Sequence, residues 1–168
     1  SSIRPLLTFT DREEKGHDIA WGAAMTIQGD DVVVYGSRSS GVPLEFGKAV
    51  FVARTRVQQL ADFPTWTFWD GQGWSTASDR AAPIIQPGRH GASTSFSAWY
   101  DASDKRWKLV YKRGEFAGDA IVESTAARPQ GPFTTKVLTL LPPSSGTDLT
   151  YLAYAHPEIP TADGSTIV

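Results

Sequence analysis

The chain has no cysteine among its 168 residues. A disulfide scaffold and any metal site built on thiolates are therefore excluded. The chain also lacks a strong charge of either sign, since its formal net charge is -2. We therefore expect no nucleic-acid partner, because such proteins carry a basic surface. No apolar run approaches the roughly 20 residues of a membrane-spanning helix, so no membrane span is expected either.

Several signatures of enzymes and cofactor sites are also missing. The sequence has no Gly-x-Ser-x-Gly nucleophile motif, no P-loop and no dinucleotide-binding fingerprint. Its three histidines, His17, His90 and His156, do not form a zinc-binding motif. We expect no cofactor, although the sequence leaves open a central ion. No stretch sustains the apolar period of a long helix.

Short β-prone runs separated by turns are what the sequence does contain. Residues 21–38 form two such runs, joined by a tight turn at Gln28-Gly29-Asp30-Asp31. Glycine accepts positive φ and aspartate bonds its own backbone, so this turn predicts a hairpin. One face of the second run would carry Val32, Val34 and Gly36, and the other would carry Val33 and Tyr35.

The same pattern returns twice, at residues 93–112 and again from residue 154 to the end. Laying the first two copies over each other aligns Val34-Tyr35 with Val110-Tyr111, and residues 52–55 with residues 122–125. The offset is roughly 70 to 76 residues, longer than common propeller repeats. Tyr35 and Tyr111, which align, are expected to be packing residues.

Repeated antiparallel strands with Gly and Pro punctuation predict an all-β fold, a β-propeller built of four-stranded blades. We divide the chain into the end of one blade (1–15), two blades (16–80 and 81–145) and the start of another (146–168). A β-sandwich is the alternative fold. The strands expected besides the hairpins are residues 4–10, 48–57, 66–74, 119–125 and 134–141.

Five pieces of the sequence together resemble one family. They are Trp-Gly-Ala-Ala with Gly-Asp-Asp-Val-Val-Val-Tyr-Gly-Ser-Arg, Val-Phe-Val-Ala-Arg-Thr, Trp-Thr-Phe-Trp-Asp-Gly, Ala-Arg-Pro-Gln-Gly-Pro-Phe and Ala-Tyr-Ala-His-Pro-Glu-Ile. The chain resembles secreted bacterial propeller domains of unknown function, some of which are grouped with endo-D-arabinan hydrolases. Those domains share the five-bladed architecture of the arabinanase and xylosidase clan.

The resemblance implies a secreted or cell-surface protein that hydrolyses or binds a furanose-containing polysaccharide. A closed propeller of this type would need roughly twice this length, with blades of about 70 residues. We therefore expect a partial propeller of about two to three blades. The missing blades would come from sequence outside this chain or from another chain.

Glycoside hydrolysis requires two carboxylates that face each other across the sugar. Asp18 and Glu158 lie near the starts of presumed innermost strands, and we expect them to be a catalytic pair, with His156 as a partner. Either carboxylate could instead close a turn or face solvent. The Asp-Pro and Trp-Ala-Pro-Asp patterns of better-known arabinanases are absent, so no role is transferred by motif.

Four further residues are expected to bind substrate. An aromatic ring such as Trp21 can stack on a sugar, and Arg38 can donate to ring hydroxyls. His90 and Tyr154 complete this set. Trp66, Trp69 and Trp74 are expected to pack in the core. The functional alternatives to a glycosidase are a non-catalytic carbohydrate-binding propeller and an interaction scaffold without a sugar site.

Overall fold

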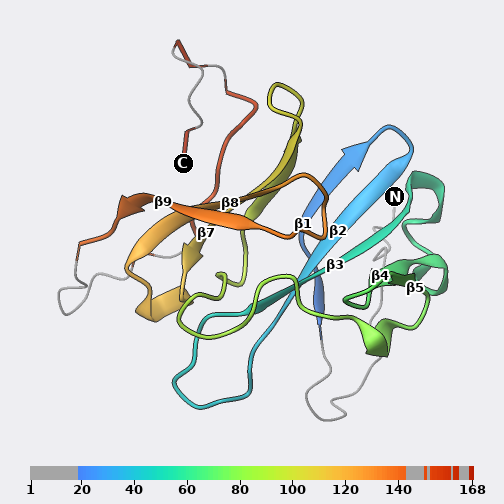
Figure 1. Ribbon diagram of the computed structural model, residues 1–168, viewed down its shortest axis with the longest axis horizontal. Helices are drawn as coiled ribbons and strands as arrows, with labels where there is room; N and C mark the ends of the chain where they lie inside the picture. Colours follow the sequence, from blue (N-terminus) through green and yellow to red (C-terminus); the bar gives the residue numbers. More distant parts are fainter. Residues whose placement is uncertain (1–18, 143–149, 151, 160, 163–166) are drawn as a thin grey trace, which may run out of the picture.

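The computed structural model describes residues 19–142, 150, 152–159, 161–162 and 167–168. These residues form nine β-strands in two antiparallel sheets (Figure 1). The helical elements among them are four 3₁₀ turns: Val57–Gln59, Phe63–Thr65, Ser78–Arg80 and Glu115–Ala117. No helix in this part of the chain is long and apolar enough to cross a membrane. The all-β class is confirmed. The expected strand 4–10 lies outside the described residues.

The first sheet has the strand order β1-β2-β3-β4-β5. Its strands are β1 (Ala20–Gln28), β2 (Asp31–Arg38), β3 (Ala49–Arg56), β4 (Thr67–Trp69) and β5 (Trp74–Ser75). The expected hairpin and the strand at 48–57 are confirmed.

The expectation of four strands in this first unit was wrong. The run 66–74 is two short strands, because the chain reverses at Asp70. Its Oδ1 atom accepts the backbone N–H groups of Gln72 at 2.9 Å and Gly73 at 2.7 Å. An Asx turn of this kind separates β4 from β5 and adds a fifth strand.

The second sheet has four strands, as expected. They are β6 (Ser97–Asp101), β7 (Arg106–Arg113), β8 (Ala120–Ala126) and β9 (Thr134–Leu140), paired in that order. The repeat alignment is confirmed by the registers of both sheets. Tyr35 lies opposite Val52 in the first sheet, and Tyr111 lies opposite Val122 in the second.

The main core lies between the two sheets. Alternate residues of β2 and β3 pack against alternate residues of β7 and β8, as the period of a strand requires. Tyr35 and Tyr111 are buried there, and Trp69 and Trp74 pack against the same cluster. The other face of β2 carries a smaller cluster that includes Trp66. The expected packing roles of both tyrosines and of all three tryptophans are therefore confirmed.

The two sheets meet at their first strands. Thr26 of β1 donates from Oγ1 to the carbonyl of Ala98 in β6, at 2.7 Å. Ser97 of β6 in turn accepts the N–H of Ala155 at 2.9 Å. The outer strands β5 and β9 lie on opposite sides of the molecule (Figure 1). Hydrogen bonds thus join β1 to β6, and β6 to the segment at Ala155.

The connector between the sheets is hydrogen-bonded to β3. Lys48 and Ala92 exchange both backbone hydrogen bonds, at 2.8 and 2.9 Å. The carbonyl of Val50 accepts the N–H of Ile84 at 2.8 Å, and Val50 donates to Ile85 at 3.0 Å. The connector therefore occupies the half of the β3 edge that the short strand β4 leaves unpaired.

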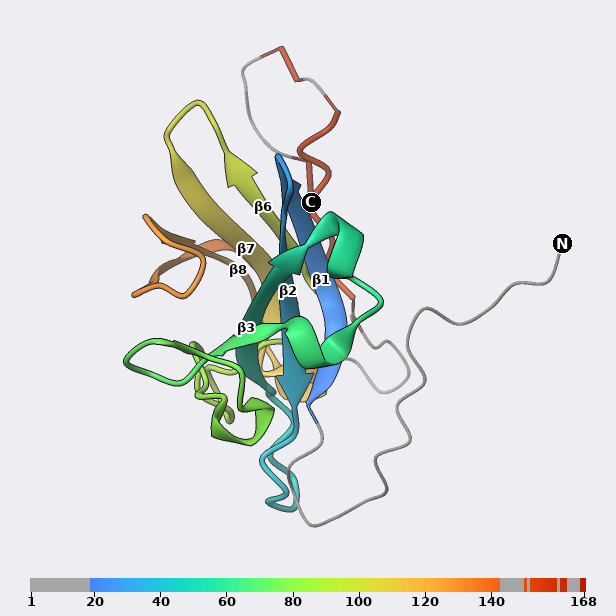
Figure 2. The ribbon, with the colours of Figure 1, turned by 90° about the vertical axis from the view of Figure 1, so that its right-hand side faces the viewer.

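The molecule has two distinct ends along the strands. The turns of the β1–β2 and β6–β7 hairpins lie at one end, which we call the hairpin end (Figures 1 and 2). The loops 39–48 and 114–119, which each join the second and third strands of a sheet, lie at the other, which we call the loop end.

Candidate functional site

His156 and Glu158 form a pair in the C-terminal part of the chain, after the second sheet. His156 makes an isolated antiparallel bridge with Ile167. The next turn brings the Nδ1 atom of His156 to 2.9 Å from Oε1 of Glu158. Both side chains are exposed. The hydrogen bond from His156 lowers the pKa of Glu158, so this carboxylate is ionised at neutral pH. An ionised carboxylate suits a base or a nucleophile, not an acid.

A cavity of about 370 Å³ lies beside this pair. It is lined by residues of the third unit and of the second sheet: Lys112, Ile121, Thr150, Leu152, Ala153, Tyr154, His156 and Val168. His156 and Tyr154, two of the expected site residues, thus share one hollow. Glu158 reaches its margin through His156.

Lys112 is the charged group buried in the wall of this cavity, with 2% of its surface exposed. Its ammonium group donates to the carbonyl oxygens of Thr150 and, at 3.5 Å, Phe116. Burial lowers the pKa of Lys112, and the nearby carboxylate of Glu115 offsets part of that effect. Sequence reasoning missed Lys112, because an alternating strand pattern does not distinguish a buried lysine from a solvated one.

Trp21 and Arg38 lie at the loop end of the first sheet and do not line this cavity. The Trp21 ring packs against Phe68 at 5.3 Å and against Trp66 at 6.5 Å. Arg38, the last residue of β2, holds its guanidinium 4.6 Å from the centre of the Phe51 ring. Both side chains have intramolecular partners, and their substrate roles stay predictions.

The two remaining site residues are placed differently. His90 is exposed in the turn between Gly88 and Gly91, ahead of β6. Asp18 lies outside the described residues, as does His17. The structure therefore brings together Tyr154, His156 and Glu158. It does not bring Trp21, Arg38 or His90 to them.

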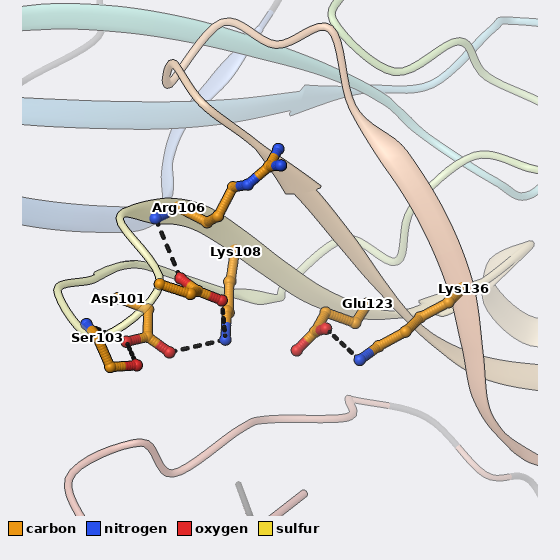
Figure 3. Close-up of polar contacts among 7 residues, drawn as sticks. Asp101, Ser103, Arg106, Lys108, Glu123 and Lys136 are labelled. Carbon is orange, nitrogen blue, oxygen red and sulfur yellow. Dashed lines mark hydrogen bonds and ion pairs between the residues drawn. The ribbon is translucent and has the colours of Figure 1, made fainter.

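A separate polar cluster lies on the outer face of the second sheet (Figure 3). Lys108 bridges the carboxylates of Asp101 at 2.7 Å and Asp104 at 3.0 Å. Hydrogen bonds from Lys108 and Ser103 hold the pKa of Asp101 well below its usual range. Nearby, Lys136 of β9 pairs with Glu123 of β8 at 2.8 Å. These charges are paired with one another, which is typical of a structural network.

The described residues contain no group of three or more His, Asp or Glu side chains that could hold a metal ion. The cavity wall thus carries the imidazole of His156, the phenol of Tyr154 and the buried ammonium of Lys112, and the carboxylate of Glu158 is hydrogen-bonded to His156.

Comparisons with known proteins place the chain in a family. Among curated proteins, none matches its sequence. Among solved structures, the chain is similar to the catalytic domain of the Coprinopsis cinerea GH62 alpha-L-arabinofuranosidase, with 15% identity and a TM-score of 0.46. That similarity covers 79% of this chain, which spans only 35% of the other. Residues 8–168 match the family described as "Domain of unknown function (DUF4185)", and the chain therefore belongs to that family.

Proposed function

We propose that this chain is part of a secreted or cell-surface glycoside hydrolase of propeller architecture that acts on furanose-containing, arabinan-like polysaccharide. The architecture is supported by the repeat, whose copies match in register at Tyr35–Val52 and Tyr111–Val122. It is also supported by the hydrogen bonds that run from β1 to β6 and from β6 to Ala155, because neighbouring blades lie side by side around a common axis. Further blades would come from sequence outside this chain or from another chain.

One observation carries the proposed chemistry. His156 holds Glu158 in its ionised form beside a cavity of about 370 Å³ that Tyr154 also lines. In this proposal Glu158 is the base or nucleophile, and Tyr154 is a sugar contact. No carboxylate among the described residues lines the cavity. Asp18 is our candidate for the acid.

The test is hydrolysis of arabinan by the protein and its Glu158→Gln variant, measured as new reducing ends. We expect the variant to lose turnover by about 10³-fold or more, because removal of a catalytic nucleophile or base costs several kcal/mol. Asp62→Asn, a change at an exposed carboxylate far along the chain, is the matched control and should leave turnover unchanged. Equal turnover in Glu158→Gln and the control would remove Glu158 from the mechanism.

The second candidate is a carbohydrate-binding propeller without turnover. The exposure of both His156 and Glu158 favours it, because catalytic carboxylates usually work in more enclosed surroundings. Retention of arabinan by the protein with no new reducing ends would support binding alone.

A further inference from the structure

A second cavity, of about 530 Å³, lies at the loop end of the two sheets. It is lined by residues 43–47 of the loop 42–47 in the first sheet, by residues 114 and 117–119 of the loop 114–119 in the second sheet, and by residues 88–89 between them. It shares no lining residue with the cavity beside His156. None of the expected site residues that the structure describes lines it, so the proposed chemistry of Tyr154, His156 and Glu158 does not explain it.

Glycine backbone forms the fixed wall of this second cavity. Gly88 donates to the carbonyl of Gly47 at 2.9 Å, and Gly114 donates to that of Gly91 at 2.8 Å. A Cβ on Gly47 would lie 2.0 Å from the Gly88 oxygen, so no side chain fits there. The two loops are thereby held at a set separation, and the cavity is formed without a ligand.

Exposed apolar side chains gather at the rim. Phe46 and Phe116, one from each loop, meet edge to face with ring centres 6.0 Å apart, and they are 38% and 48% exposed. Val42 and Leu44 of the first loop are also exposed, Leu44 to 86%. Leu44 has φ +63°, a conformation that costs free energy in a residue other than glycine. Solvent-exposed apolar groups on a strained loop indicate a binding surface.

The charges around the cavity indicate a neutral ligand. Glu45, Arg89 and Asp119 line it, and the Asp119 carboxylate is paired with Arg113 at 2.6 Å. The two acidic groups are Glu45 and Asp119, and the two basic groups are Arg89 and Arg113. Their formal charges sum to zero. Carboxylates accept hydrogen bonds and guanidinium groups donate them, while each hydroxyl of a sugar does both. Apolar rings beside such groups suit the C–H face of a sugar.

We infer that the cavity between loops 42–47 and 114–119 binds one neutral sugar ring, in contact with Phe46 and within reach of Glu45, Arg89 and Asp119. The choice of an arabinan-type ring rests on the proposed function. The geometry is independent of it. The site would hold a polysaccharide at a position separate from the Tyr154–Glu158 site.

The test is the affinity of the protein for arabinotetraose, measured by isothermal titration calorimetry. Phe46→Ala removes the apolar contact, and Ala117→Trp fills the cavity with an indole. We expect each to weaken binding about tenfold or more, the change that corresponds to one lost aromatic contact. Val57→Ala, at an exposed apolar residue outside the cavity, is the matched control and should bind like the parent protein.

Two further measurements decide between explanations. Glu158→Gln should keep its affinity even if it loses turnover, so failure of the hydrolytic proposal and failure of this one are distinguishable. Equal affinity in Phe46→Ala, Ala117→Trp and the control would overturn the inference. Tighter binding of tetragalacturonate than of arabinotetraose would also overturn it, because the ligand would then be an anion. Sedimentation velocity measures self-association of the parent protein and of both variants. If the variants differ from the parent protein only in self-association, the rim of the cavity binds a second copy of the protein, and the inference of a sugar site is wrong.

Discussion

Thr26 and Ala98 occupy equivalent places in the two sheets and are joined by a hydrogen bond of 2.7 Å. Thr26 lies opposite Val33 in the β1–β2 hairpin, and Ala98 lies opposite Leu109 in the β6–β7 hairpin. The two copies of the repeat therefore touch at the same position of their first strands, beside the core that lies between the facing sheets.

Thr26→Val should destabilise the fold by about 1 kcal/mol, because the carbonyl of Ala98 loses its partner while the volume of the side chain is kept. Urea unfolding monitored by tryptophan fluorescence would measure the loss. Thr26→Ser keeps the hydroxyl and is the control. Wild-type stability in Thr26→Val would show that the hydrogen bond contributes nothing to the junction.

Gly91→Ala should destabilise the fold by roughly 2 kcal/mol or more, a typical cost of forcing atoms into a packed site. Its Cβ would lie 2.7 Å from the carbonyl carbon of Gly47 and 2.8 Å from the Lys48 oxygen. Gly73→Ala is the matched control, because nothing lies within 4 Å of its Cβ position. Thermal unfolding midpoints would separate the two variants. Similar midpoints would mean that the backbone around Gly91 shifts at little cost to make room for the new Cβ atom.

Acid should destabilise the β6–β7 hairpin through Asp101. Its pKa is lowered in the folded protein, first by the hydrogen bond from Lys108 and then by those from Ser103. The stabilisation is therefore present above the ordinary pKa of about 4 and is lost as pH falls toward the folded value. Asp101→Asn should cost about 1 kcal/mol at neutral pH and flatten the loss of stability below pH 4. The free energy of unfolding of both proteins, measured between pH 7 and acid pH, tests this prediction. It is contradicted if the variant loses stability below pH 4 as steeply as the parent protein does.

The proposed role of Glu158 predicts a shift in the pH profile of turnover. Without His156, the pKa of Glu158 should rise toward its ordinary value, because the hydrogen bond that lowers it is lost. His156→Ala should therefore move the acid limb of kcat/KM to higher pH. His156→Gln, which restores a donor, should move it back in part. A lower kcat/KM with an unmoved acid limb would assign His156 a different role.

The sheets could be predicted from sequence because their determinants are local. Gly29 defines the turn of the first hairpin, and the run Val32-Val33-Val34-Tyr35 defines β2, whose successive side chains point to opposite faces. Both signals are independent of the rest of the fold. The extra strand β5 was missed because only the Asx turn at Asp70 separates it from β4, and aromatic residues fill both strands. The site was harder to predict, because it depends on which strand ends come together in space.

Lys112 and Glu45 illustrate that difficulty. The place of Lys112 depends on a carbonyl contributed by Thr150, 38 residues further along the chain. Glu45 lines its cavity because the glycines of three segments bring two loops together. The residues adjacent to Lys112 and Glu45 in the sequence do not predict either of these contacts, because the partners lie in distant segments. By contrast, His156 and Glu158 are only two residues apart, and a single turn brings their side chains together. Both residues were predicted from the sequence.

The pairing of the connector with β3 has a consequence for how this protein can be divided. Although the repeat suggests interchangeable modules, the second repeat begins with residues that complete the sheet of the first, at Lys48–Ala92 and Val50–Ile85. A cut at the repeat boundary would expose backbone donors and acceptors along β3, and such bare edges recruit other strands. The two units therefore overlap along the chain, and the division that keeps the first sheet whole lies after Ala92, where the pairing with β3 ends.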